Sequence, residues 1–328
     1  MILVTGGGGF IGSNLVAGLE AHGHGPVAVC DSLGNGSKWR NIAKRNLAEL
    51  ISPTHLFNWL ATHSNELDIV FHLGAISDTT ARDVDAIVAA NIRLTLDLWD
   101  WCAEADKRLI YASSAATYGN GNVGFDDDMS QTALARLRPL NPYGWSKLLV
   151  DRRIAQHLGD RDKQPRQWVG LRFFNVYGPN EYHKDKQRSV AVQIYEQANS
   201  SGTCKLFRSH NPDYPNGKQQ RDFIWVDDCI QVMLWLMDNP HISGLFNLGT
   251  GKARTFADLA SAVFAALGHT THIEYIDTPL EVQRHYQYLT QARMERLRNA
   301  GFARPFTSLE DGVRAYVRDY LATDDPYR

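Results

Sequence analysis

The chain has 328 residues, of which 44% are hydrophobic and 21% are charged. These fractions are typical of a globular protein with a sizeable core, and the length predicts more than one domain. A formal net charge of -2 at pH 7 gives no electrostatic reason to expect nucleic acid or an anionic membrane as a partner.

A glycine-rich turn follows the first apolar run of the chain, residues 2–4, which predicts a strand. Gly6 allows a tight turn, Gly9 lets the backbone approach a diphosphate, and Gly12 brings the next helix close to the strand. The helix N-terminus then offers free N–H groups to phosphate. Because an apolar helical stripe follows, the pattern predicts a dinucleotide site rather than an ordinary flexible loop.

Asp31 ends the second apolar run, residues 27–30. A carboxylate about 20 residues after the glycines can accept hydrogen bonds from the adenosine ribose. The alternative is a turn residue before Gly34 and Gly36. Taken alone, Asp31 favours NAD, because its charge repels a 2′-phosphate.

Apolar runs at 69–71, 109–111 and 169–171 alternate with segments of helical spacing at 86–104 and 144–157. This alternation predicts the α/β class, a Rossmann-type doubly wound parallel sheet with helices on both faces. The alternation of strand and helix patterns ends after Phe174, and residues 209–220 are predicted to form a loop.

Two later apolar runs, residues 223–226 and 245–248, are predicted to be strands that pack against the first sheet, and helices are expected at 256–267 and 309–320. We therefore expect a smaller α+β substrate domain, with the ligand in the cleft between the two domains. The predicted domains are residues 1–174 plus 222–250 for NAD(P) binding, and residues 175–221 plus 251–328 for the substrate.

The four cysteines are widely spaced and lie mostly in apolar runs, so we expect reduced, buried thiols. The glycine turn begins too close to the first methionine for a cleaved signal peptide, which predicts a cytoplasmic protein. No apolar stretch is long enough to cross a membrane. His269 and His272 lack a third ligand, so no metal is expected.

Tyr143 and Lys147 are four residues apart in a predicted helix and therefore lie on one face. A free tyrosine has a pKa of about 10, but an adjacent ammonium and an oxidised nicotinamide both favour the phenolate. Ser114 follows a predicted strand, where sheets of this class bind ligands, and could hydrogen-bond the reacting oxygen. Taken alone, Tyr143 and Lys147 could be a surface pair, and Ser114 could be a turn residue. The order of the glycine turn, Ser114 and the Tyr143–Lys147 pair along the chain favours an active site.

These motifs together resemble the extended short-chain dehydrogenase/reductase family, which includes nucleotide-sugar epimerases and dehydratases. The likeness covers nearly the whole chain. Within the family, residues 173–184, 206–208, 221–223 and 286–287 most resemble the epimerases that invert C6 of ADP-glycero-manno-heptose, a precursor of the lipopolysaccharide core. The resemblance implies inversion through a transient 6-keto sugar with bound NAD(P).

Three alternatives stay open: a UDP-hexose 4-epimerase, a dehydratase, and a non-catalytic dinucleotide-binding protein. Ala115 and Ala116 follow Ser114 where dehydratases have an acidic residue, which disfavours elimination. Lys184 disfavours a 4-epimerase, because C4 epimerases manage without a lysine there.

The resemblance implies that Tyr143 and Lys184 are the two acid/base groups and that Ser114 and Lys147 support Tyr143. An exposed loop lysine is the alternative for Lys184. The implied cofactor residues are Gly6, Gly9, Phe10, Ile11, Gly12, Asp31, Ser32, Lys38, Leu73, Gly74, Ala75, Ile76, Ser77, Asn91, Tyr143, Lys147 and Val176. The implied substrate residues are Ser114, Asn175, Lys184, Lys186, Gln193, Phe207, Arg208, Ser209, Arg221 and Tyr286.

An arginine suits a diphosphate because its fork donates two parallel bonds, although Arg221 could instead pair with Asp222 or Asp227. The resemblance favours tightly bound NADP over NAD, one per subunit, since Lys38 and its basic neighbours offset the charge of Asp31. It also implies a homo-oligomer, a pentamer by likeness.

Two segments depart from the family pattern. Residues 185–189 replace a Gly-x-Met-Ala-Ser segment, and Gln193 stands where a histidine is common. The loop at 210–220 is longer than in the shortest members. We therefore expect an altered substrate pocket.

Overall fold

The computed structural model describes residues 1–159, 163–283 and 286–328, and the side chains of Lys186, Glu281 and Val282 lie outside that description. A seven-stranded sheet forms its centre, with the strand order β11-β6-β5-β4-β1-β2-β3. All neighbouring strands in it are parallel, which confirms the predicted Rossmann-type sheet. Its strands are β1 (Ile2–Thr5), β2 (Val27–Cys30), β3 (Glu49–Ile51), β4 (Ile69–His72), β5 (Arg108–Ser114), β6 (Gln167–Phe173) and β11 (Gly244–Leu248).

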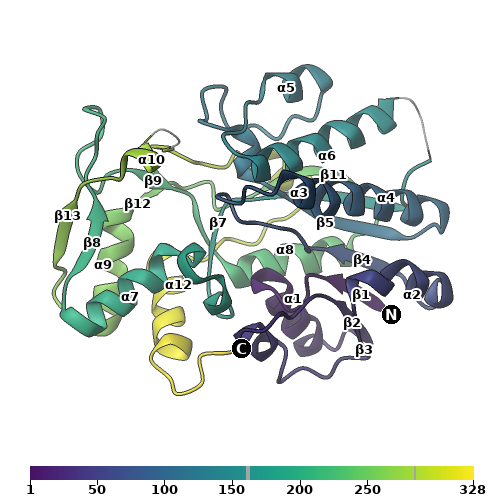
Figure 1. The fold of residues 1–328 in the computed structure, drawn as a ribbon, viewed down its shortest axis with the longest axis horizontal. Helices are drawn as coiled ribbons and strands as arrows, with labels where there is room; N and C mark the ends of the chain where they lie inside the picture. Colours follow the sequence, from purple (N-terminus) through teal and green to yellow (C-terminus); the bar gives the residue numbers. More distant parts are fainter. Residues whose placement is uncertain (160–162, 284–285) are drawn as a thin grey trace.

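Helices cover both faces of this sheet (Figure 1). One face packs against α1 (Phe10–Ala21) and α8 (Val226–Asp238). The other packs against α2 (Leu56–His63), α4 (Leu94–Glu104) and α6 (Pro142–Gly159). The predicted helical segment 86–104 is continuous, since α3 (Val84–Ile87) leads through the π-turn η3 (Val88–Arg93) into α4.

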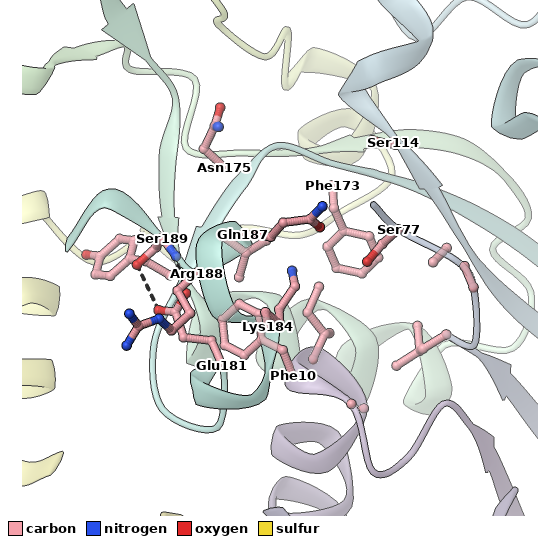
Figure 2. A pocket seen from close by; sticks show the side chains of 18 of the residues that line it. Phe10, Ser77, Ser114, Phe173, Asn175, Glu181, Lys184, Gln187, Arg188 and Ser189 are labelled. Atoms are coloured by element: carbon pink, nitrogen blue, oxygen red, sulfur yellow. Dashed lines mark hydrogen bonds between the residues drawn. The ribbon is translucent and has the colours of Figure 1, made fainter. Parts of the chain in front are cut away.

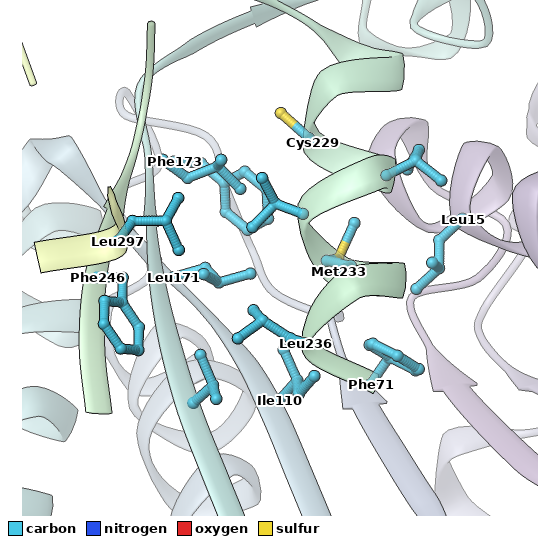
Figure 3. Packing of buried hydrophobic residues seen from close by; sticks show 14 of the residues in the cluster. Leu15, Phe71, Ile110, Leu171, Phe173, Cys229, Met233, Leu236, Phe246 and Leu297 are labelled. Atoms are coloured by element: carbon cyan, nitrogen blue, oxygen red, sulfur yellow. The ribbon is translucent and has the colours of Figure 1, made fainter. Parts of the chain in front are cut away.

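Side chains along each strand alternate between two apolar cores, because successive residues of a strand point to opposite faces. Phe71 and Ile110 pack toward α1 and α8, where Leu15, Met233 and Leu236 meet them (Figure 3). Their neighbours Val70, Leu109 and Tyr111 pack toward α2, α4 and α6 instead. Burial on both faces explains the near-continuous apolar runs of these strands.

The remaining elements build a second, smaller body beside the carboxyl ends of the strands (Figure 1). Its core joins three helices and the two-stranded sheet β8–β13. The elements are β7 (Asn175–Tyr177), α7 (Val190–Ser201), β8 (Cys204–Phe207), β9 (Gln220–Arg221), β10 (Phe223–Trp225), β12 (Arg254–Thr255), α9 (Phe256–Leu267), β13 (Ile273–Ile276), α10 (Leu280–Gln283) and α12 (Leu309–Tyr316) with the π-turn η6 (Val317–Leu321). The second body also contains η5 (Tyr182–Gln187), whose Tyr182 packs against its core. Short elements elsewhere are η1 (Ser37–Asn41), η2 (Pro53–His55), η4 (Ala115–Tyr118), α5 (Gln131–Arg136) and α11 (Glu295–Asn299).

Both later runs contain strands that pack against the central sheet, as predicted. Residues 245–248 also join that sheet, since β11 pairs with β6. Residues 223–225 form β10, which pairs with β7 in a separate two-stranded sheet, and Val226 already begins α8. Only alternate residues of β10 can reach the central core, so Ile224 packs there while Phe223 and Trp225 pack into the second body.

The four cysteines are buried and free, as expected. In the described ranges, no helix is both long and apolar enough to cross a membrane, and no cluster of three or more possible ligands could hold a metal ion.

Candidate functional site

The glycine turn between β1 and α1 is built for close backbone approach. Gly6 has a φ of +69°, and a Cβ added to Gly12 would lie 2.1 Å from the Gly6 carbonyl oxygen. Gly9, at the N-cap of α1, supplies no side-chain cap, so the first N–H groups of the helix stay free for an anion. These residues fit the diphosphate of a dinucleotide.

Asp31 lies where the ribose of that dinucleotide is expected. Its carboxylate accepts hydrogen bonds from the Gly8 N–H at 2.9 Å, the Ser32 N–H at 2.7 Å and Lys38 Nζ at 2.6 Å. Lys38 also donates to the Ser32 carbonyl. The lysine therefore places a positive charge directly on the carboxylate that would otherwise repel a 2′-phosphate.

A cavity of about 510 Å³ lies at the carboxyl ends of the strands, between the two bodies. It brings together most of the predicted cofactor residues and the four predicted catalytic side chains. The predicted residues that line it are Gly6, Gly9, Phe10, Ile11, Gly12, Asp31, Lys38, Leu73, Gly74, Ala75, Ser77, Ser114, Tyr143, Lys147, Asn175, Val176 and Lys184.

Tyr143, Ser114 and Lys147 meet at one wall of this cavity. Ser114 ends β5 and hydrogen-bonds the phenol of Tyr143, which the first turn of α6 presents. Burial raises the pKa of Tyr143 and the Ser114 hydrogen bond opposes that rise. The expected fall of the Tyr143 pKa toward neutral pH therefore needs positive charge in addition to the Ser114 hydrogen bond.

Lys147 is buried one helical turn further along α6, and Asp151 lies one turn beyond it. Burial lowers the pKa of Lys147 to about 8, and the charge of Asp151 opposes this fall. Asp151 is itself held by Arg172, whose Nη2 lies 2.9 Å from its carboxylate, with both side chains 0% exposed. The Asp151 member of this buried pair lies on the same face of α6 as Tyr143 and Lys147, further along the helix.

Lys184 enters the same cavity from the second body. Lys184 lies in η5 and is half-buried. The alternative interpretation, an exposed loop lysine, is therefore excluded. Lys184 Nζ lies 5.7 Å from the ring centroid of Phe10, and Figure 2 shows the amine pointing into the cavity between Gln187 and Phe173. Burial lowers the pKa of Lys184 and Glu181 opposes this, so the lysine can exchange a proton nearer to neutral pH than a free lysine can.

The segment that carries Lys184 is fastened to α1 and η1 by asparagines that the sequence did not single out. Asn14 Nδ2 donates to the Pro179 carbonyl at 2.9 Å, and Asn41 Nδ2 donates to the Asn180 carbonyl at 3.0 Å. A substitution at either asparagine would therefore change the position of Lys184 relative to α1 and η1.

Two predicted cofactor residues, Ile76 and Asn91, act on each other and are not part of the cavity lining. The Asn91 side chain accepts from the Ile76 N–H at 2.8 Å and donates to the Ile76 carbonyl at 2.9 Å. Asn91 thereby fixes the loop of residues 73–77 that forms one wall of the cavity. Ser32 likewise stands just outside, where its carbonyl binds Lys38.

Arg221 and Tyr286 are not among the residues that line the cavity, but Arg221 contacts Phe256, which does line it. The Arg221 guanidinium is 5.4 Å from the ring centroids of both Phe256 and Tyr286. Its Nη1 donates to the Gln220 carbonyl. The alternative pairing of Arg221 with Asp222 is not found, because that carboxylate accepts from backbone and side-chain donors of residues 250, 251 and 292. Asp227 pairs with Arg328 instead.

The other predicted substrate residues lie further out. Phe207 ends β8, just before the 209–220 loop. Ser209 begins that loop, and its Oγ donates to the Asn211 carbonyl. Arg208 is exposed and pairs with Asp277 at 3.0 Å. Gln193 lines a separate surface pocket and donates to the Arg188 carbonyl, and the side chain of Lys186 lies outside the described part of the chain.

Further residues line the cavity that the sequence did not mark as functional. They are Thr79, Phe173, Phe174, Glu181, His183, Gln187, Arg188 and Ser189, among others. Several fall in the 173–184 segment that carried the family resemblance, which was the available signal. No spacing in the sequence indicates which of them face the cavity.

The fold and the cavity define a Rossmann-type enzyme that holds a dinucleotide beside a serine–tyrosine–lysine set. The family model described as the NAD dependent epimerase/dehydratase family matches residues 2–249. The chain belongs to this NAD(P)-dependent family.

Relatives with full-length similarity carry a more specific description. The ADP-L-glycero-D-manno-heptose-6-epimerase of Nitratidesulfovibrio vulgaris strain DP4 is 46% identical, with 100% of each chain covered. The enzyme of the same name from Fusobacterium nucleatum is 42% identical, again over 100% of both. The crystal structure of the Helicobacter pylori ADP-L-glycero-D-manno-heptose-6-epimerase superimposes with a TM-score of 0.80 at 30% identity, covering 97% of this chain and 95% of that one.

Proposed function

We propose that this chain inverts C6 of ADP-glycero-manno-heptose through a transient 6-keto sugar. One observation supports this most: Tyr143 and Lys184 line a single cavity and come from different bodies of the molecule. An inversion needs proton transfer at an oxygen on either side of the sugar, so two separately placed groups suit it. The full-length relatives named above supply the substrate.

In the proposed mechanism, Tyr143 and Lys184 act in turn. One removes the proton of the C6 hydroxyl as the ketone forms, and the other protonates the oxygen after the sugar has presented its opposite face. Ser114 hydrogen-bonds the phenol and holds it in place. The Lys147 ammonium, one turn along α6, would favour the ionised form of the phenol. The bound nicotinamide supplies reversible hydride acceptance at the carbon.

For the cofactor we propose NADP, held by the glycine turn and the loop of residues 73–77. Lys38 supports this choice, because its ammonium is 2.6 Å from Asp31 and offsets the repulsion between that carboxylate and a 2′-phosphate. Ser32, Ile76 and Asn91 would act from the rim of the site by fixing Lys38 and the loop.

For the nucleotide half of the substrate we propose Arg221 as the main diphosphate contact. Its guanidinium is buried between two aromatic rings, with its charge available beside the cavity. Tyr286 would flank the same phosphates, and Asn175 would reach them from the cavity lining. The residues proposed for the outer part of the site are Lys186, Gln193, Phe207, Arg208 and Ser209.

We further propose that residues 1–174 plus 222–250 bind the dinucleotide and that residues 175–221 plus 251–328 bind the sugar nucleotide. The position of Lys184, across the cavity from Tyr143, follows from that division. A homo-oligomer, by likeness a pentamer, is part of the same proposal.

The test is to incubate the purified protein with a panel of nucleotide-sugars and follow inversion by NMR. ADP-glycero-manno-heptose is expected to reach an equilibrium of its two C6 epimers, while UDP-hexoses stay unchanged. Lys184→Ala is expected to lower turnover by about 10²–10⁴-fold with Tyr143 intact. Near-normal turnover in that variant would remove Lys184 from the mechanism, and inversion of UDP-hexoses would redirect the assignment to C4.

A further inference from the structure

Glu181 is a buried carboxylate in the cavity wall to which the proposed mechanism gives no role. Its side chain is 1% exposed and accepts four hydrogen bonds. Ser189 donates both its N–H and, at 2.8 Å, its hydroxyl. The Gly178 N–H donates at 3.3 Å, and the Tyr316 hydroxyl donates at 3.0 Å. Buried carboxylates are costly unless donors surround them, so this arrangement has a structural consequence.

The four donors come from both sides of Lys184. Gly178 precedes the lysine by six residues and Ser189 follows it by five, while Tyr316 comes from α12 of the second body. One carboxylate therefore closes residues 178–189 into a loop and ties that loop to α12. The bonds to Ser189 are drawn in Figure 2, to the left of the amine of Lys184.

Backbone strain next to the lysine indicates that the loop is held rather than relaxed. Asp185 has a φ of +47° and a ψ of −117°, a conformation that residues with a side chain rarely adopt. Such a residue costs about 1–3 kcal/mol and persists only where its surroundings impose it. Glu181 supplies that constraint, because its bonds reach past Asp185 to Ser189.

Glu181 also acts on the charge of Lys184. All four of its partners donate, an arrangement that suits the ionised carboxylate, although burial raises its pKa. Its negative charge opposes the fall that burial imposes on the pKa of Lys184. The other groups around the amine are His183 of the same segment, the Phe10 ring of α1, and Tyr143 and Lys147 of α6 across the cavity.

We propose that Glu181 is the positioning residue for Lys184: it fastens the 178–189 loop so that the amine stays in the cavity, and it gives that amine its nearby anion. The inference rests on the acid/base role proposed above for Lys184. It assigns the geometry of the loop to one side chain, which acts through Lys184.

The experiment compares Glu181→Gln with Glu196→Gln, a matched removal of a carboxylate that is half-exposed and pairs with Arg188. In Glu181→Gln, kcat is expected to fall about tenfold or more, with KM and cofactor content little changed. The limb of the kcat–pH profile that reports Lys184 is expected to move to lower pH, because the ammonium has lost its anion. A purely structural role would not move that limb. Glu196→Gln is expected to leave both quantities as in the wild type.

Hydrogen exchange of the amides at 182–188 separates this inference from the proposed function. Faster exchange in Glu181→Gln, and not in Glu196→Gln, supports the fastening role even if the wild type inverts no ADP-heptose. Ser189→Ala combined with Tyr316→Phe removes two side-chain donors and keeps the charge, so it serves if Glu181→Gln does not fold. Unchanged exchange, or an unchanged kcat and pH profile in an active enzyme, would overturn the proposal.

Discussion

The buried pair of Asp151 and Arg172, next to Lys147 along α6, allows a prediction with a definite magnitude. Arg172 Nε and Nη2 lie 3.0 and 2.9 Å from one carboxylate oxygen of Asp151, and Ser113 donates to the same oxygen at 3.0 Å. Asp151→Asn leaves the Arg172 charge uncompensated in a site where both side chains are 0% exposed. Breaking such a pair costs about 3–5 kcal/mol. The melting temperature is expected to fall by about 5–15 °C.

The same substitution is expected to change the pH dependence of turnover. Lys147 has a pKa of about 8 that burial lowers and Asp151 supports. Without Asp151 the pKa falls further, by roughly one unit, so the ammonium is lost at a lower pH. Because that ammonium favours the Tyr143 phenolate, activity that declines above about pH 8 in the wild type should decline nearer pH 7 in the variant.

Thermal unfolding and a kcat–pH profile measure both effects. Asp126→Asn is the matched control, since Asp126 forms an exposed pair with Arg293, where 49% and 65% of the two side chains are accessible. Such a surface pair is worth about 0–1 kcal/mol. If Asp151→Asn behaved like Asp126→Asn in both measurements, the buried pair would be neither stabilising nor connected to Lys147.

Three further substitutions test the cavity. Gly12→Ala places a Cβ 2.1 Å from the Gly6 carbonyl oxygen, so the purified protein should release no nicotinamide cofactor on denaturation; full cofactor content would contradict this. Gly144→Ala places a Cβ 2.6 Å from the Ala116 carbonyl oxygen and shifts α6, so steady-state kinetics should show kcat reduced by about 10²-fold, and a normal kcat would be the opposing result. Arg221→Ala should raise KM for the nucleotide-sugar about tenfold or more, because charge-assisted bonds are worth about 1.5–3 kcal/mol, and an unchanged KM would exclude the phosphate contact.

The central sheet and the cofactor turn could be predicted because their signals are local. The apolar runs at 69–71 and 109–111 are buried on both faces and read as continuous strands. The spacing of Tyr143 and Lys147 fixes them on one face of α6 whatever the rest of the chain does. The predicted helix at 256–267 has the bounds of α9, since Thr255 and Asp258 form a capping box there.

Features that depend on distant partners could not be predicted. The pattern of residues 223–226 shows a strand but not its neighbour, so the pairing of β10 with β7 was missed. Arg221 and Asp222 are adjacent in the chain but have different partners. Arg221 lies between two aromatic rings, whereas Asp222 accepts hydrogen bonds from residues 250, 251 and 292. Glu181 reads as an ordinary loop glutamate, because its burial depends on Tyr316, more than a hundred residues later.

The proposed chemistry requires that the hydrogen removed from C6 is the one returned to it, and this can be measured directly. One C6 epimer of ADP-glycero-manno-heptose is incubated with the protein in D₂O, and both the configuration and the isotope at C6 are followed by NMR and mass spectrometry. We expect full equilibration of the two epimers with ordinary hydrogen retained at C6, since only the hydroxyl proton passes through Tyr143 and Lys184. Inversion with deuterium incorporated at that carbon, or no inversion at all, would contradict the account.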